Sequence, residues 1–419
     1  EWERAYELYK ELDEPGEVES LVERAGSTMI VHGQLLTLSE WLDSLPAELM
    51  AKHPALISLR GTVAVTRGDT REGIRLLDQA VSGMRANGDQ LQLATTLTRR
   101  SIAKLYAGQY LEADEDAEEA LVFAAQDNGG NPYYGELYAD ALMCKGTVLS
   151  YLGSLDDSLD YLQKALAAYQ KLNDANSAAK VRLEIGRVSR ALGRYAEAEE
   201  AYLQALEYYQ ATNNLTWQAN LYNSLGVLKH GRGDHIAATA AFEKAVEYAK
   251  ISGSPRLEAY ALASIGDLYQ ELDAVQETLE AYRQAREVAR RIRDGYLEQY
   301  LSLMEARLFL SQGAVERAEE RLEEARLKAD ELGLPSEQIL CQLERGRAQL
   351  CRADFEAAYT NIKSALAYLV EEGHLVEIPR ARLYALVAAL SLGKLDDAER
   401  QAELLLPLLD DSDQKKRLT

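Results

Sequence analysis

The chain has few of the residues that interrupt helices or cross-link domains. Its 419 residues include only 8 prolines and 3 cysteines. So little proline permits many long helices. Three cysteines (Cys144, Cys341 and Cys351) are too few for a disulfide framework. We therefore expect buried thiols in a reducing compartment, the cytoplasm.

Long apolar runs and an excess of positive charge are also absent. No run approaches the roughly 18 apolar residues that a membrane span requires, so we expect no membrane association. The net charge is -22, from 68 acidic and 46 basic side chains. Such a chain repels a phosphate backbone, which argues against direct nucleic-acid binding.

The motifs of nucleotide and metal chemistry are missing as well. No G-x-x-x-x-G-K-[ST] loop occurs, and the two nearest histidines, His230 and His235, lack the i, i+4 spacing of a helical zinc site. We therefore expect no metal, no cofactor and no catalytic residue. The chain itself is predicted not to be an enzyme, although a parent protein could carry a separate NTPase module.

What the sequence does contain is a repeat of 40 residues. Turn positions recur at this spacing, with one step of 35 residues and one of 45. They are Gly33, Gly68, Gly108, Gly153, Gly193, Gly233, Asp273, Gly313, Ala353 and Gly393. The longer step falls in residues 127–132, which are rich in turn formers, so we expect a longer loop there.

Small residues precede most of these turns by seven positions. They are Gly26, Gly61, Ser101, Gly146, Gly186, Gly226, Gly266, Ala306 and Gly346. Glycine inside a helix costs about 1 kcal/mol relative to alanine, so a second helix is expected to pack closely there. Nine residues after most turns stands a bulky residue flanked by alanines, as at Tyr202, Phe242 and Tyr282. Each unit is therefore predicted to be a helix, a tight glycine turn and an antiparallel helix.

The resulting fold prediction is an all-α solenoid of about ten helix-turn-helix repeats, forming a single domain over residues 1–419. Within it we expect a helix at 1–15, a degenerate first repeat at 16–53, regular repeats at 54–405 and a polar, mobile tail at 406–419.

The repeat resembles the tetratricopeptide repeat, lengthened from its usual 34 residues. This resemblance implies a right-handed superhelix with a concave groove lined by the first helix of each hairpin. A second resemblance rests on Leu38, Trp41 and Leu42 with Leu45-Pro46, followed by Pro54 and Leu56. These residues look like the start of the sensor domain of MalT-like transcriptional activators.

That second resemblance carries its own implications. In MalT-like activators a nucleotide-binding STAND module and an arm region precede the sensor, and a LuxR-type helix-turn-helix follows it. The helix at 1–15 would then be the last arm helix, and this chain would correspond to the sensor alone.

The groove positions follow from the repeat register and the resemblance. They lie one and four residues after each small residue and three and six residues before it. The charged, amide and aromatic residues in or near these positions are Asp140, Lys180, Arg187, Arg190, Asn220, Asn223, His230, Tyr260, Asp267, Gln270, Tyr300 and Arg307. Asparagine amides suit a peptide backbone or sugar hydroxyls, the basic residues suit a carboxylate or phosphate, and the tyrosines offer stacking surfaces.

Other charged residues are expected to be structural. Acidic runs such as Glu115-Asp116 with Glu118-Glu119 are predicted to form a solvated face. The basic run from Arg283 to Arg293 fits a protein docking stripe, but Glu280 and Glu287 lie beside it, so pairing with these glutamates is favoured. The groove residues, too, are open to a structural interpretation in which they pair among themselves, for example Arg307 with Asp267.

Two functions fit these observations. The first is a sensor of a MalT-like regulator that binds an inducer or a protein in its groove. The second is a free-standing adaptor that holds extended segments of partner proteins. The ligand is a protein, a peptide or a small molecule in either case, and we expect the isolated chain to be a monomer.

Overall fold

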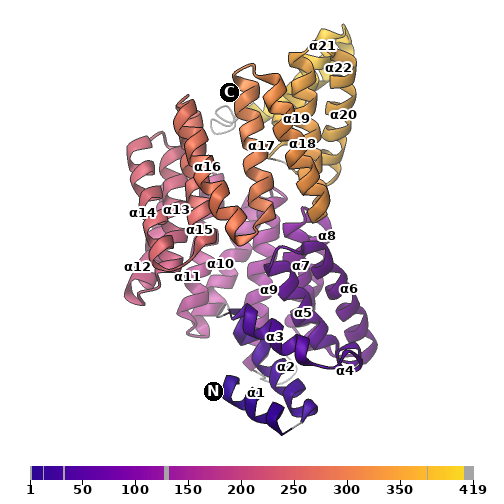
Figure 1. The fold of residues 1–419 in the computed structure, drawn as a ribbon, viewed down its shortest axis with the longest axis vertical. Coiled ribbons are helices and arrows are strands. Elements are labelled where there is room, and N and C mark those ends of the chain that lie inside the picture. Colours follow the sequence, from indigo (N-terminus) through magenta and orange to yellow (C-terminus); the bar gives the residue numbers. More distant parts are fainter. Residues whose placement is uncertain (1, 13, 32–33, 127–131, 375, 410–419) are drawn as a thin grey trace. The chain divides into compact units, whose positions relative to one another are not determined.

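The computed structural model describes residues 2–12, 14–31, 34–126, 132–374 and 376–409. Over these residues the chain forms 22 α-helices and no β-strand (Figure 1). None of these helices is both long and apolar enough to cross a membrane. The contacts divide the chain into two compact units, residues 1–148 and 149–419.

Unit 1 holds the more irregular helices. They are α1 (Trp2–Glu11), α2 (Pro15–Val31), α3 (Leu35–Ser44), α4 (Ala47–Lys52), α5 (Pro54–Thr66), α6 (Thr70–Asn87), α7 (Gln90–Tyr106), α8 (Tyr110–Ala124) and most of α9 (Pro132–Tyr151). The core of the first part stacks the Tyr6 and Trp41 rings, whose centroids are 4.4 Å apart, and buries Leu38 and Leu42.

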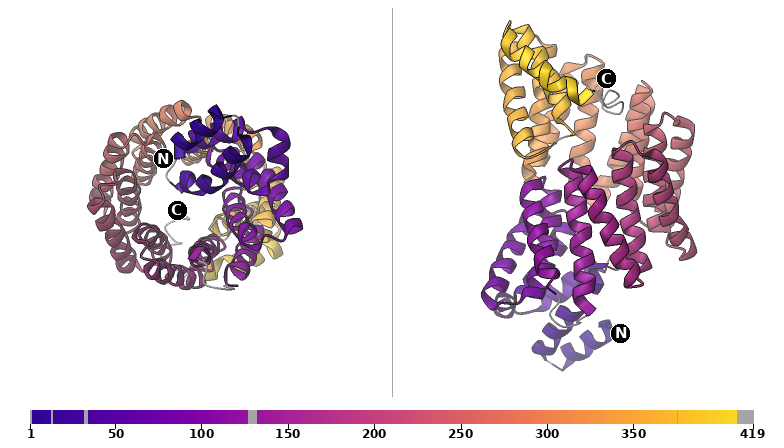
Figure 2. Two further views of the ribbon diagram at one scale, coloured as in Figure 1. Left: turned by 90° about the horizontal axis from the view of Figure 1, so that it is seen from below. Right: turned by 180° about the vertical axis from the view of Figure 1, so that it is seen from behind.

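Unit 2 is a regular run of helical hairpins. Its helices are α10 (Leu155–Lys171), α11 (Ala175–Ala191), α12 (Tyr195–Ala211), α13 (Leu215–Gly231), α14 (His235–Ile251), α15 (Pro255–Glu271), α16 (Val275–Ile292), α17 (Gly295–Ser311), α18 (Val315–Leu332), α19 (Pro335–Cys351), α20 (Phe355–Glu371), α21 (Ile378–Ser391) and α22 (Leu395–Leu409). Figures 1 and 2 show these hairpins side by side in chain order. The odd-numbered members from α11 to α21 are the first helices, and the even-numbered members from α12 to α22 are the second helices.

The turns repeat every 20 residues, twice per hairpin. From residue 153 onward each turn holds one residue with positive φ: Gly153, Asn173, Gly193, Asn213, Gly233, Gly253, Asp273, Arg293, Gly313, Gly333, Ala353, Gly373 and Gly393. Several of these turns continue into an aspartate or asparagine that caps the next helix, as Asp234 Oδ1 does by accepting the Ala237 N–H at 3.1 Å. The left-handed residue ends one helix and the capping residue begins the next.

The predicted packing of bulky residues onto glycines is confirmed. A Cβ placed on Gly226 would lie 2.5 Å from the Phe242 ring, and one placed on Gly61 would lie 2.9 Å from Leu77. The side chains of Tyr202, Tyr282 and Ile362 occupy the same space beside Gly186, Gly266 and Gly346. Glycine at these positions brings the two helices of a hairpin close enough to bury a large side chain between them.

Two sequence predictions are wrong. Cys144 and Cys341 are buried free thiols, as expected, but Cys351 is exposed because it ends α19 next to the turn at Ala353. Asp116 is also misassigned. Its side chain is 5% exposed and pairs with buried cations, because it faces α7 across the hairpin and not solvent.

Some predicted features lie outside the described residues. These are the turn at Gly33, the loop at 127–131 and the polar tail from 410 onward. The first residues assigned to that tail, 406–409, form the last turn of α22.

Candidate binding surface on the first helices of unit 2

The first helices of unit 2 form a continuous wall. Each of them, from α11 to α21, contacts the next first helix in addition to its own hairpin partner. Side chains that point away from the second helices therefore lie beside their counterparts from neighbouring repeats. We call this surface the first-helix face.

The α11 part of this face is basic. Arg187 is 46% exposed; its guanidinium lies 3.2 Å from Glu184 and donates to the Tyr151 hydroxyl at 3.3 Å. The Glu184 carboxylate is the main cause of the raised pKa of Arg187. The Lys180 ammonium lies 5.8 Å from the centre of the Trp217 ring.

Arg190 completes this basic group. It hydrogen-bonds the Tyr202 hydroxyl and lies close enough to influence it electrostatically. Burial raises the pKa of Tyr202 to about 12, although Arg190 and Arg187 act in the opposite direction.

On α13 the face carries amides and a histidine. Asn220 and Asn223 are both partly buried, and Asn223 Oδ1 is a buried acceptor without a hydrogen-bond donor among the described residues. Farther along α13, His230 Nε2 lies 2.6 Å from Glu271 Oε2 of α15. The His230 and His235 rings are 6.0 Å apart.

On α15 and α17 the predicted residues form one network. Asp267 accepts hydrogen bonds from the hydroxyls of Tyr282 at 2.6 Å and Tyr300 at 2.9 Å. Gln270 Oε1, 3.0 Å from the Tyr282 hydroxyl, shares the single proton that this hydroxyl donates. Burial raises the pKa of Asp267, while these hydrogen bonds and the charges of His230 and Arg307 act to lower it. Tyr260 lies apart from this network, under the Arg256 guanidinium at 5.7 Å.

Arg307 does not pair with Asp267 as the structural interpretation supposed. Its Nε donates to Glu344 of α19 at 2.8 Å, and its Nη2 lies 3.5 Å from Glu377, the residue before α21. Burial acts to lower the pKa of Arg307, but the two carboxylates raise it. One side chain therefore connects three successive hairpins.

Asp140 is the predicted residue that belongs to unit 1. It lies on α9 within unit 1, is exposed, and interacts electrostatically with Arg99. Burial lowers the pKa of Arg99 to about 10, and Asp140 counteracts that effect. Asp140 is therefore not assigned to the first-helix face of unit 2.

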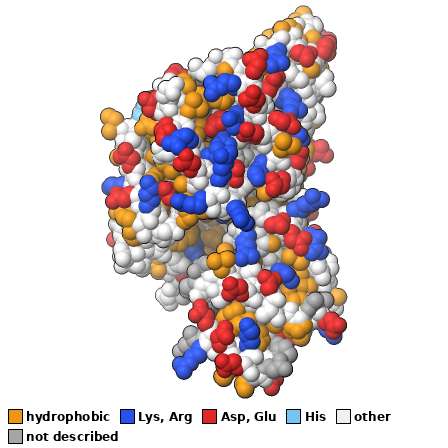
Figure 3. All heavy atoms as spheres, in the orientation of Figure 1, with side chains coloured by type: hydrophobic (Ala, Val, Ile, Leu, Met, Phe, Trp, Pro, Cys, Tyr) orange, Lys and Arg blue, Asp and Glu red, His pale blue; other side chains and the backbone are white. Residues whose placement is uncertain are grey.

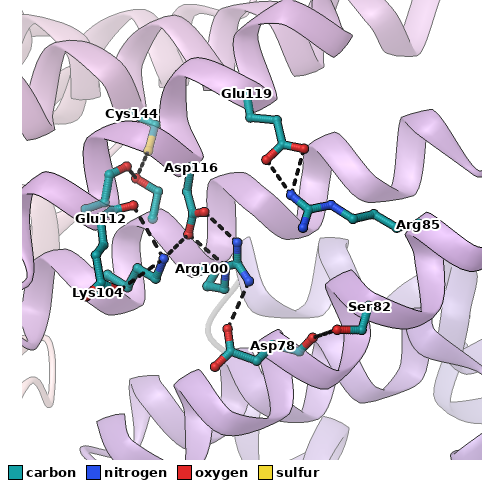
Figure 4. Close-up of polar contacts among 11 residues, drawn as sticks. Asp78, Ser82, Arg85, Arg100, Lys104, Glu112, Asp116, Glu119 and Cys144 are labelled. Carbon is teal, nitrogen blue, oxygen red and sulfur yellow. Dashed lines mark hydrogen bonds and ion pairs between the residues drawn. The ribbon is translucent and has the colours of Figure 1, made fainter.

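Unit 1 has a polar cluster of its own, between α6, α7 and α8 (Figure 4). Arg100 bonds Asp116 at 2.6 Å and Asp78 at 2.9 Å, while Lys104 lies 3.0 Å from Asp116. These groups satisfy one another's charges across two neighbouring hairpins, so the cluster is structural.

A shallow depression in unit 1 is acidic. It is lined by Asp114, Glu115, Glu118, Glu119, Val122, Phe123 and Lys145. Its single basic residue, Lys145, is nearly buried and lies 2.9 Å from both Asp114 and Glu118. No cation is left over there to attract an anionic ligand.

The basic run of α16 is largely paired, but only Arg283 uses the predicted partners; Arg290 and Arg291 contact Glu298 and Glu258 of first helices. Arg283 contacts both Glu280 and Glu287, and Arg286 is buried against Glu305 at 2.8 Å. Figure 3 shows acidic and basic side chains interspersed over the visible surface. Among the described residues no group of three His, Cys, Asp or Glu side chains is arranged to hold a metal ion.

Sequence reasoning missed four polar residues around Arg307. Gln299, Glu337, Glu344 and Glu377 lie outside the four register positions that were used to define the groove. Glu344 falls two residues before Gly346, on the side of α19 that faces α17. A search for acidic residues within reach of Arg307 on the next two first helices would have found Glu344 and Glu377.

Comparisons with known proteins agree with this geometry. A family model described as tetratricopeptide repeat matches residues 137–211 and 177–251. No curated protein matches the chain. The fold is thus a tetratricopeptide-like α-solenoid, as predicted.

Three solved structures share this fold at low sequence identity. A Rap protein complexed with competence and sporulation factor has a TM-score of 0.58 and 12% identity, covering 87% of this chain and 98% of its own. Aspartyl phosphate phosphatase F from Bacillus subtilis has a TM-score of 0.52 and 13% identity, covering 78% and 91%. The Rap conjugation gene regulator of plasmid pLS20, in complex with the Phr* peptide, has a TM-score of 0.51 and 15% identity, covering 68% and 76%.

Proposed function

We propose that the chain binds an extended protein or peptide segment along the first-helix face of unit 2. The observation that carries this proposal is Asn223, whose buried amide oxygen has no hydrogen-bond donor among the described residues. An unpaired buried acceptor costs about 1–3 kcal/mol, and a backbone N–H of a bound segment would satisfy it. Asn220, one helical turn earlier, supplies a second amide on the same helix.

The neighbouring groups suit the same kind of ligand. Lys180, Arg187 and Arg190 offer charge-assisted hydrogen bonds to a carboxylate of that segment. Arg187 remains 46% exposed although it contacts Glu184, so it is accessible to a ligand. The similar Rap structures include one in complex with the Phr* peptide, which supports a peptide more than a small-molecule inducer.

Thermal denaturation with a peptide library tests this proposal. A peptide at 100 times its Kd stabilises the folded state by about 2.7 kcal/mol, which appears as a rise in Tm. We expect Asn223→Ala and Arg187→Ala to abolish that rise. The control Arg283→Ala, on the second helix α16, should leave it intact. Failure of every peptide to shift Tm, or an equal loss in the control, would contradict the proposal.

At the level of the whole protein, we propose a cytoplasmic regulator of the MalT-like type, in which this chain is the sensor. The residues that resemble such sensors are the buried core of α1 to α5, where Tyr6 stacks on Trp41 and donates to Ser44 at 2.8 Å. The alternative is a free-standing adaptor. The complete reading frame separates the two, because the regulator requires an upstream nucleotide-binding module and a downstream helix-turn-helix.

A further inference from the structure

The α17 to α21 part of the first-helix face contains buried polar atoms without a hydrogen-bond partner among the described residues. Glu344 and Gln299 are 0% exposed, and Glu344 Oε2 and Gln299 Oε1 have no hydrogen-bond partner among the described residues. Glu344 uses its other oxygen for Arg307. Glu344 Oε2 also lies 3.7 Å from Arg347 Nη1, which leaves Gln299 Oε1 as a fully buried acceptor with no donor among the described residues.

Within this cluster Glu337 is the carboxylate without a cation of its own. Arg307 is bonded to Glu344, and Arg380 lies 2.7 Å from Glu377. Among the residues that the structure describes, Glu337 forms no ion pair within 4.0 Å and receives only a hydrogen bond from the Gln299 amide. Burial raises the pKa of Glu337 to about 7, because the nearby Arg307 does not fully compensate for the lost hydration and for the charge of Glu377.

The acidic groups of this cluster are not all sealed from solvent. Glu337 is only partly buried, and the Glu377 side chain is 20% exposed. A group arriving from solvent can therefore reach these two carboxylates, whereas Glu344 and Gln299 are fully buried. A lysine ammonium, an arginine guanidinium or a peptide N-terminus would supply the ion pair that Glu337 lacks.

We propose that Glu337 and Glu377 form a subsite for a basic group of the bound segment. This inference rests on the proposed function, since it assigns chemistry to one end of the same face. The α11 end presents Lys180, Arg187 and Arg190, and the α19 end presents an unpaired carboxylate. The preferred ligand therefore carries an acidic group for α11 and a basic group for α19.

The distance between the two ends sets the length of a suitable probe. Four successive first-helix contacts lead from α11 to α19. Because contacting helices lie about 8–10 Å apart, the path between the two ends is roughly 30–40 Å long. An extended chain covers about 3.3 Å per residue, so roughly 12 residues bridge the two ends. A random dodecapeptide library matches this span.

The experiment is a display selection of random dodecapeptides on the whole chain, repeated with Glu337→Gln and with the control Glu320→Gln. Glu320 is an exposed residue of the second helix α18. We expect the wild-type chain and the control to enrich peptides that contain Lys or Arg. Replacing that basic residue with norleucine should weaken binding to the wild type about tenfold, but leave binding to Glu337→Gln unchanged. The Tm of each variant, measured alone, verifies that it is folded.

The outcomes separate this inference from the proposed function. Enrichment of peptides with no preference for a basic residue overturns the basic subsite while the binding face stands. An equal loss on norleucine substitution for wild type and Glu337→Gln also overturns it. If no peptide is enriched at all, the proposed function itself is wrong.

Discussion

At the scale of single residues, the turns hold the clearest departures from low-energy backbone. Ala353 has a φ of 61°, a left-handed conformation that costs an L-residue with a Cβ about 1 kcal/mol or more. We expect Ala353→Gly to stabilise the chain by about 0.5–1 kcal/mol, since glycine adopts this conformation freely but gains freedom when unfolded. Urea denaturation measures the change.

An alanine-to-glycine substitution inside a helix should change the free energy of unfolding in the opposite direction. Ala167 is an exposed residue in the middle of α10, where glycine costs about 1 kcal/mol. Equal effects of Ala353→Gly and Ala167→Gly would show that the backbone conformation at 353 is misassigned.

Asp116 provides a second residue-scale prediction. Removing its carboxylate in Asp116→Ala leaves Arg100 and Lys104 largely buried without their closest counter-charge, which typically costs about 3–5 kcal/mol. The neighbouring Glu115 is exposed, so Glu115→Ala should change stability by less than about 0.5 kcal/mol. A small effect of Asp116→Ala in chemical denaturation would mean that the cluster in Figure 4 is solvated.

Glu337 links stability to pH. Its pKa is raised from 4.5 to about 7, so the folded chain binds this proton more tightly than the unfolded chain. The resulting stability is fully present below pH 4.5 and is lost as pH rises toward 7. Relative to wild type, Glu337→Gln should therefore be stabilising by about 2–3 kcal/mol at pH 8 and close to neutral at pH 4.

Denaturation midpoints of wild type and variant across that pH range measure this difference. The groups facing Glu337 are Arg307, Glu377, Gln299 and Cys341, and they are unchanged in the variant. A constant difference between wild type and Glu337→Gln at all pH values would contradict the raised pKa.

At the scale of helices, the packing of each hairpin depends on glycine under a large side chain. In α13, a Cβ on Gly226 meets Phe242 at 2.5 Å, whereas a Cβ on Gly231 meets nothing within 4 Å. Gly226→Ala should thus destabilise by about 1–3 kcal/mol despite the better helix propensity of alanine. Gly231→Ala on the same helix should be neutral or slightly stabilising, and both changes are measurable by thermal denaturation.

The repeat register accounts for how much of the structure was predictable. Turn residues such as Gly193 and small mid-helix residues such as Gly186 recur at fixed spacing, so the helices and their pairing follow from the sequence. The contacts of Arg307 do not recur from repeat to repeat. Its partners Glu344 and Glu377 come from two later hairpins, and most of the equivalent positions of other repeats hold unrelated residues. Asp116 was misjudged for a similar reason: its charge suggested solvent, but its buried partners lie on another helix.

At the scale of the whole molecule, the two units differ in their use of charge. In unit 1 the buried charges around Arg100 are paired with one another, and Lys145, the basic residue of the acidic depression, is paired with Asp114 and Glu118. Both units hold buried acceptors without hydrogen-bond partners, but on the first-helix face of unit 2 Asn223 Oδ1 shares the surface with the exposed Arg187 and the unpaired carboxylate of Glu337. We therefore assign binding to unit 2 and a structural role to the clusters of unit 1.

The most direct test of this assignment is hydrogen exchange of the whole chain with and without a selected dodecapeptide. We predict slower amide exchange in the first helices α11, α13, α15, α17 and α19 when the peptide is bound, with smaller changes in α12, α14, α16 and α18. Protection confined to the second helices, or to residues 1–148, would contradict the account.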